Sequence, residues 1–235
     1  MSGGTICFIP CCKSKNPVKS SAQSSTLWYE NASFGQMLLK GRDSMKARID
    51  MDAPQTEALS LYSGHFYRVL DKQRITDKIQ NDSLRVFILS AGYGIVEAQE
   101  FIQDYDAKME GSIARTWKNE GLTKIIAETL LKYQPDKVFG FFAGEKNWAG
   151  SISKYRYFYS EGVKQALSQG LKATEAGCFY RAEGQSAGPI LSALGLCFME
   201  AVSSDFSDAV INSVNEGGFR PDRYPSVLLK YDRFV

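Results

Sequence analysis

Two adjacent cysteines and two lysines, close behind the first apolar run of the chain, are its strongest candidates for chemistry. Cys11, Cys12, Lys13 and Lys15 follow TICFIP, a short continuous run that ends at a proline. Such a run is typical of a central strand, and proline ends a strand because it has no backbone N–H to donate. Open α/β sheets bind ligands beyond the carboxyl ends of their strands. We therefore expect these thiols and amines to bind a substrate there; the alternative is a solvated basic loop with two incidental thiols.

Acidic side chains gather behind a second apolar run, VFIL at residues 86–89. Asp104, Tyr105 and Asp106 lie in the segment that follows this run. Acid and base catalysis uses carboxylates beside amines, since an opposite charge lowers the pKa of a carboxylate and burial raises it. We expect Asp106, Asp104 and Lys15 to be the catalytic residues. For each acid, the alternative is a solvated acidic loop.

The strands expected from the apolar runs leave the sheet toward one shared edge. Three runs end at PCCKSK (10–15), SAGYG (90–94) and AGEKNW (143–148). A broad apolar face predicts a long helix at 112–133 between the second and third runs, so that strand, helix and strand form a parallel unit. Besides the cysteines and Lys13, the binding residues expected at this edge are Ser90, Tyr93, Gly94, Tyr105 and Glu145.

The segment LYSGHFYRVL at 61–70 supplies further candidates from the start of a predicted helix. Tyr62, Ser63 and His65 are expected to contact substrate. His65 is the one histidine of the chain. A lone histidine is more often structural than catalytic, so a thiol nucleophile that uses it as a base is a weak alternative.

The pattern as a whole predicts one α/β domain over residues 1–235, with three layers and a mostly parallel sheet between helices. Residues 5–145 form the expected core, and 150–235 are expected to complete the sheet and the helical layer. The serine-rich segment 16–26 is expected to be a mobile loop beside the site. We expect helices at 27–48, 57–72, 112–133, 155–169 and 191–202, further strands at 173–181 and 227–235, and a loop at 216–225.

Composition excludes several classes of protein. A net charge of +2 is far from that of a protein that holds nucleic acid by charge alone. Five cysteines without a CxxC pair argue against a disulfide framework and a zinc site, and favour a reducing, cytoplasmic compartment. The N-terminus does not predict a signal peptide, and no apolar run predicts a membrane span. The motifs of P-loop, Rossmann, zincin and zinc-deaminase proteins are missing, so we expect neither a metal nor another cofactor.

The order of three motifs resembles a known family. IPCCKSKNP at 9–17, LYSGHFYRVL at 61–70 and ILSAGYGIVEAQEFIQDYD at 88–106 are similar to bacterial and phage domains that include relatives of the peroxide-stress protein YaaA. The first motif also resembles archaeosine synthase relatives of tRNA-guanine transglycosylase. This chain departs from the pattern at Cys12, at Gly92, where lysine is common, and in a long insertion before LYSGHF. The motif positions are occupied by Pro10, Cys11, Lys15, Tyr62, Ser63, Phe66, Ser90, Tyr93, Gly94, Tyr105 and Asp106.

The resemblance implies a uracil-DNA-glycosylase-like fold and an N-glycosidase. The expected activity is that of a DNA glycosylase that removes a modified nucleobase, in modified phage DNA as an antiviral defence. Such cleavage passes through a cationic sugar that a carboxylate stabilises, after the base is flipped out and stacked on a ring such as Tyr93, Tyr62 or Trp148. A Lys15 amine that lost its proton would add a lyase step.

Two alternatives remain open. One is a non-catalytic DNA-binding stress protein on the same fold, and the other is an enzyme that modifies a free nucleotide or deazapurine. The modest net charge favours the free nucleotide. The 16–26 loop and the basic, aromatic run YRYFY at 155–159 favour a polymer, although that run also fits a helix face packed on the sheet.

Overall fold

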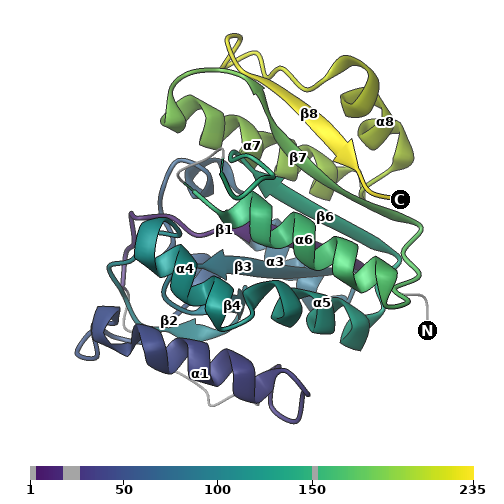
Figure 1. Ribbon diagram of the computed structural model, residues 1–235. Coiled ribbons are helices and arrows are strands. Elements are labelled where there is room, and N and C mark those ends of the chain that lie inside the picture. Colours follow the sequence, from purple (N-terminus) through teal and green to yellow (C-terminus); the bar gives the residue numbers. More distant parts are fainter. Residues whose placement is uncertain (1–3, 18–26, 150–152) are drawn as a thin grey trace.

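The computed structural model describes residues 4–17, 27–149 and 153–235, and these form an α/β fold around a six-stranded sheet (Figure 1). The strand order is β4-β3-β1-β6-β7-β8. The four inner strands are parallel, whereas both edge strands run antiparallel to their neighbours. This confirms the predicted three-layer fold with a mostly parallel sheet. The strands are β1 (Thr5–Pro10), β3 (Leu84–Ser90), β4 (Gly94–Glu97), β6 (Lys137–Phe142), β7 (Glu175–Glu183) and β8 (Leu228–Arg233).

Helices cover both faces of the sheet, with α4, α5 and α6 in front and α3 and α7 behind (Figure 1). Alternate residues of β6 make the two faces distinct, because successive side chains of a strand point to opposite sides. Phe142 packs on Tyr159 of α6, while Phe141 packs on Phe198 of α7. The helices are α1 (Gly35–Met45), α2 (Ala58–Leu61), α3 (Lys72–Gln80), α4 (Gly111–Asn119), α5 (Leu122–Tyr133), α6 (Tyr155–Ser168), α7 (Ala187–Ser203) and α8 (Asp208–Gly217).

The segment after Glu145 extends the sheet, since β7 and β8 lie beside β6. The helices expected at 155–169 and 191–202 and the strands expected at 173–181 and 227–235 are present. A second, two-stranded sheet pairs β2 (Thr56–Glu57) with β5 (Phe101–Ile102) and holds the segment before α2 against the segment after β4. None of the helices in the described ranges is long and apolar enough to cross a membrane.

Several element boundaries differ from the predictions for local reasons. The helix expected at 112–133 is two helices, because Gly121 adopts a left-handed φ of 77° between them. The helix expected at 57–72 is only α2 and a short 3₁₀ turn, Tyr67–Val69. The next helix, α3, starts behind Asp71, whose carboxylate accepts a hydrogen bond from the Arg74 N–H. A helix, α8, also ends inside the loop expected at 216–225, and most of the loop expected at 16–26 lies outside the described residues.

The packing of β6 against α6 leaves no room for a side chain at Gly140. A Cβ atom there would lie 2.5 Å from the ring of Tyr159. We therefore expect Gly140→Ala to lower the free energy of unfolding by about 1–3 kcal/mol, as overpacking does. Gly217→Ala is the control, because a Cβ atom at Gly217 meets nothing within 4 Å, and its stability should stay unchanged or rise slightly. Urea denaturation measures both, and equal midpoints would contradict this packing.

Candidate functional site

The sheet has a topological switch point between β1 and β6, because later strands are added on opposite sides of these two neighbours. The chain passes from β1 outward to β3 on one side, and from β6 outward to β7 on the other. Ligands of open α/β sheets bind at such a point, beyond the carboxyl ends of the strands. Cys11 follows β1, and its Sγ atom lies 2.9 Å from the hydroxyl of Tyr155, the first residue of α6. This contact joins the segments that leave the two strands and marks the candidate site.

Lys15 is held at this carboxyl edge by the segment that contains Tyr105. Its Nζ atom donates a hydrogen bond of 2.6 Å to the backbone carbonyl of Tyr105 and lies 4.0 Å from the centre of that ring. The carboxylate of Asp104 lies 3.3 Å from the same Nζ atom. The Lys15 side chain is only 5% exposed. A buried ammonium must be paired, and this one has a carboxylate, a carbonyl and a ring face as partners.

The hydroxyl of Tyr105 lies at the centre of a buried hydrogen-bond network. It lies 2.8 Å from the Tyr62 hydroxyl and accepts a hydrogen bond of 3.0 Å from Ser90. The Ser90 Oγ atom in turn accepts the backbone N–H of Tyr93 at 3.1 Å. Burial, and next the neighbouring Cys11 thiol, raise the pKa of Tyr105 well above its usual range. Tyr62, Ser90 and Tyr105 are fully or nearly fully buried, so they support the site from below.

The SAGYG motif is a tight turn between β3 and β4, and its glycines are required by packing. Gly94 has a φ of 73°, and a Cβ atom there would lie 2.6 Å from the ring of Trp117. The Trp117 indole donates a hydrogen bond of 2.7 Å to the carbonyl of Ala91. A Cβ atom at Gly92 would lie 2.7 Å from the ring of Tyr105. The motif therefore positions aromatic rings around the site.

Tyr93 is nearly buried on the other side of Tyr105. The two rings meet edge to face with centres 5.6 Å apart, and the Tyr93 hydroxyl accepts the backbone N–H of Gln103 at 3.2 Å. Burial raises the pKa of Tyr93 to about 12. Its phenol is therefore neutral at physiological pH.

The two cysteines point to different partners. Cys11 contacts Tyr155, whereas the Sγ atom of Cys12 accepts the backbone N–H of Gly64 at 3.2 Å and donates to the carbonyl of Ser14 at 3.0 Å. Burial raises the pKa of the Cys12 thiol. A raised pKa keeps the thiol protonated and weakens it as a nucleophile. The geometry thus gives Cys12 a role in tying the β1 exit to the segment 61–64.

The side chains of the other predicted residues form no ion pair or hydrogen bond with Lys15 or Asp104 among the described residues. The Asp106 side chain is exposed, and within the described ranges no residue forms an ion pair or hydrogen bond with its carboxylate. His65 is exposed beside Gly188 at the start of α7, and Glu145 is exposed with Arg181 3.5 Å away. Lys13 is exposed, and Ser63 is half-buried, with its backbone N–H bonded to the Ser14 carbonyl at 3.0 Å.

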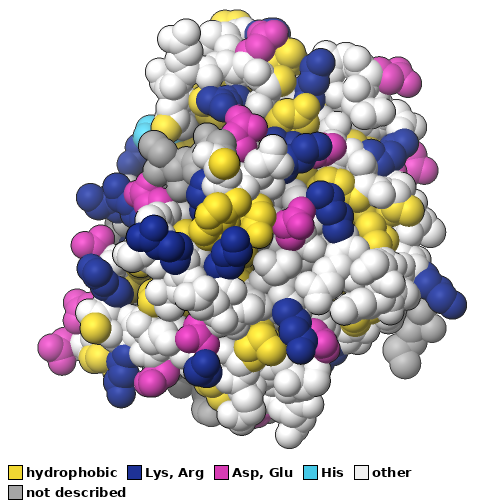
Figure 2. Space-filling model, viewed as in Figure 1, with side chains coloured by type: hydrophobic (Ala, Val, Ile, Leu, Met, Phe, Trp, Pro, Cys, Tyr) yellow, Lys and Arg dark blue, Asp and Glu magenta, His cyan; other side chains and the backbone are white. Residues whose placement is uncertain are grey.

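A cluster of rings and cations combines Trp148 on the loop between β6 and α6 with Tyr157 on α6 and Lys118 on α4. The rings of Trp148 and Tyr157 are half-buried with centres 5.0 Å apart, and the Nζ atom of Lys118 lies 4.3 Å from the centre of the Trp148 ring. We call these three residues the Trp148 platform. Figure 2 shows hydrophobic side chains flanked by Lys and Arg side chains over α4 and the start of α6. Sequence reasoning named Trp148 and the run at 155–159, which contains Tyr155 and Tyr157, but missed Lys118, whose position depends on the packing of α4.

The described side chains show no metal centre, because no three His, Cys, Asp or Glu residues among them gather as metal ligands would.

Comparison with known families gives one match. A sequence model of the family described as peroxide stress protein YaaA matches residues 19–137, just over half of the chain. The match covers Tyr62, Ser90, Asp104 and Tyr105 and begins after Lys15. No curated protein matches this chain.

The buried network predicts how Tyr105→Phe changes stability. Removal of the hydroxyl leaves Tyr62 and Ser90 short of a buried partner, which should cost about 1–3 kcal/mol at neutral pH. In the folded chain the Tyr105 phenol also keeps its proton, whereas in the unfolded chain it loses this proton above a pH of about 10. The wild type therefore loses stability as the pH rises beyond that value, at about 1.4 kcal/mol per pH unit for each such tyrosine.

Urea denaturation between neutral and strongly alkaline pH measures both effects. Above a pH of about 10, the free energy of unfolding of Tyr105→Phe should fall less steeply with pH than that of the wild type. The difference in slope should be the contribution of one tyrosine, roughly 1.4 kcal/mol per pH unit. Curves that run parallel above pH of about 10 would show that the Tyr105 phenol is not held neutral by burial.

Proposed function

We propose that this chain, which belongs to the family of the peroxide stress protein YaaA, binds DNA at the carboxyl edge of its sheet. One observation carries this proposal, namely the Trp148 platform beside the candidate site. Half-buried rings next to cations are what proteins use to hold single-stranded nucleic acid, because every base has a face on which a ring can stack.

The charges around the platform support a polymer that carries phosphates. Arg115 is exposed one turn before Lys118 on α4, and Lys108 precedes the same helix and is also exposed. Lys154 also approaches the Trp148 ring, with its Nζ atom 5.6 Å from the ring centre. A ligand base that stacks on Trp148 would release Lys118 toward a phosphate. Because the chain has a net charge of only +2, stacking must supply much of the affinity.

The test is binding of a fluorescent single-stranded oligonucleotide, measured by anisotropy. We expect Trp148→Ala to weaken binding about tenfold or more, since one stacked base contributes about 1–3 kcal/mol. Lys118→Ala should reduce the slope of log K against log salt by about 0.7. Lys172→Ala is the matched control, because Lys172 is exposed on the connection between α6 and β7, at the opposite edge. Equal affinities for wild type and Trp148→Ala would refute the platform as the binding surface.

A DNA glycosylase is the second candidate, and the closeness of Lys15 and Asp104 favours it. Hydrolysis would add water across the glycosidic bond, with hydroxyl to the sugar carbon and a proton to the departing base. Asp104 would stabilise the cationic sugar, and Lys15 would bind a phosphate or the base. Asp104 is about one-third exposed, so a substrate can reach it without unfolding the segment.

The glycosylase proposal is tested with DNA that contains uracil, hydroxymethylcytosine or its glucosylated form. We expect free base and abasic sites from the wild type, and Asp104→Asn should lower the rate about a hundredfold or more. Asp43→Asn is the matched control, because Asp43 is exposed on α1 and is not among the residues expected to act on a substrate. Intact DNA from all three substrates would end this proposal and leave the DNA-binding proposal standing.

A further inference from the structure

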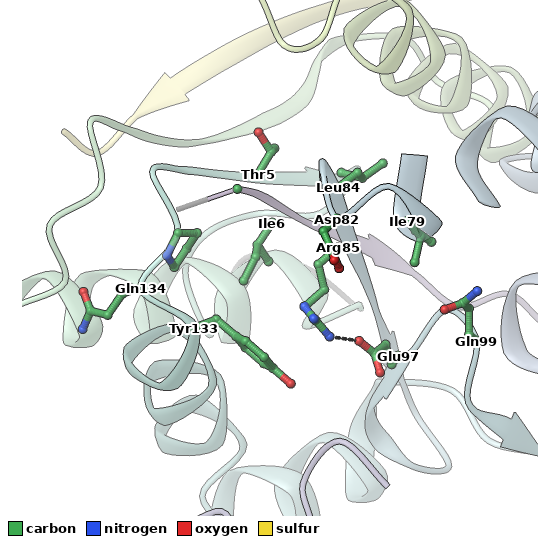
Figure 3. A pocket seen from close by; sticks show the side chains of 12 residues that line it. Thr5, Ile6, Ile79, Asp82, Leu84, Arg85, Glu97, Gln99, Tyr133 and Gln134 are labelled. Carbon is green, nitrogen blue, oxygen red and sulfur yellow. Dashed lines mark hydrogen bonds and ion pairs between the residues drawn. The ribbon is translucent and has the colours of Figure 1, made fainter. Parts of the chain in front are cut away.

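A hollow of about 550 Å³ opens at the edge of the sheet opposite the candidate site (Figure 3). It is lined by the starts of β1 and β3, the end of β4 and the C-terminal ends of α3 and α5. None of the residues expected to act on a substrate lines it. The volume lies within the range of small-molecule sites, which is roughly 300–1,000 Å³.

A guanidinium group projects into this hollow. Arg85 reaches from β3 to the carboxylate of Glu97 on β4 (Figure 3), and its guanidinium lies 4.3 Å from the centre of the Tyr133 ring. The ion pair uses the Nη1 group, and no other described residue accepts a hydrogen bond from this guanidinium. The Arg85 side chain is 34% exposed. Its remaining donors, in a planar fork, are suited to a carboxylate.

The rest of the hollow attracts positive charge. Asp82 is exposed on its rim, and its carboxylate has no ion pair or hydrogen bond with a described residue. Burial raises the pKa of Glu97, so Arg85 does not fully offset the cost of desolvating that carboxylate. The helices α3 and α5 end at Gln80 and Tyr133, and helix C-termini favour cations. Two carboxylates therefore face one guanidinium.

Apolar side chains form another wall. Ile6, Ile79 and Leu84 line the hollow beside the charged groups. A bare metal ion would leave most of this volume empty and would make no use of the apolar wall. A phosphate would be repelled by the two carboxylates.

We propose that this hollow binds a small zwitterion with a carboxylate and an ammonium group on the same carbon, as in an α-amino acid. The carboxylate pairs with the free donors of Arg85, and the ammonium pairs with Asp82 and Glu97. The ligand side chain lies against the apolar wall. The inference is independent of the proposed function, because the two sites lie at opposite edges of the sheet.

The test begins with a thermal-shift screen of the full chain against each proteinogenic L-amino acid. The amino acid that stabilises most is then compared by calorimetry with its analogue that lacks the amine and with its analogue that lacks the carboxylate. We expect at least one amino acid to bind, and each truncated analogue to bind about tenfold or more weakly, since each loses its charge-assisted hydrogen bonds to the hollow. Inorganic phosphate should not bind.

Two variants locate the ligand. Arg85→Gln should abolish binding, and Asp82→Asn should weaken it about tenfold or more and keep the fold, because Asp82 is exposed. Asp222→Asn is the control, since Asp222 is exposed and does not line the hollow. If Arg85→Gln fails to fold, Asp82→Asn still decides. Absence of binding by every amino acid, equal binding by an analogue that lacks one charged group, or unchanged binding by Asp82→Asn would overturn the proposal.

Discussion

The carboxyl edge depends on the burial of one phenol, that of Tyr105, in an extended segment. Successive side chains of an extended chain point to opposite sides, so an inward Tyr105 turns both Asp104 and Asp106 outward. The hydroxyl of Tyr105 is fixed by Tyr62 and Ser90, which prevents the segment from slipping by one residue. Its backbone carbonyl holds Lys15 at the same time. One residue thus sets the register of the segment and the position of the amine.

The buried Lys15 ammonium, which also donates to the Lys13 carbonyl at 3.4 Å, is well placed but not free. Lys15 would have to leave Asp104 and the Tyr105 carbonyl before it could attack a sugar, and leaving a buried ion pair is costly. Binding through exposed groups carries no such cost. For this reason the Trp148 platform, with its half-buried rings, supports the proposed DNA binding more directly than Lys15 supports a lyase step.

Continuous apolar runs made β1 and β6 predictable, and a broad apolar face predicted the helical segment that contains α4 and α5, although as one helix. The break at Gly121 and the cap at Asp71 were missed because one left-handed glycine or one carboxylate can outweigh the apolar periodicity around it. The sequence placed Lys15, Asp104 and Asp106 at one edge of the sheet, and Lys15 pairs there with Asp104, whereas no described residue pairs with the Asp106 carboxylate. The catalytic roles of these residues stay predictions.

Other parts of the site depend on tertiary packing. Asp104 and Asp106 look equivalent in the sequence, because both flank Tyr105, and only the path of the folded chain brings Asp104 to Lys15. Lys118 reaches Trp148 because α4 packs near the start of α6, across about thirty residues of chain. The hollow around Arg85 combines five separate elements, and no local pattern marks it.

Gly92 has a consequence for how related chains are compared. Its hydrogen atom occupies the space where any larger group would meet the face of Tyr105. A chain with any larger residue at this position must seat its aromatic residue differently or shift the turn after β3. Identical residues on either side of position 92 in a sequence alignment therefore need not occupy the same positions in the two structures. A chain with a larger residue there presents a differently placed ring at the carboxyl edge.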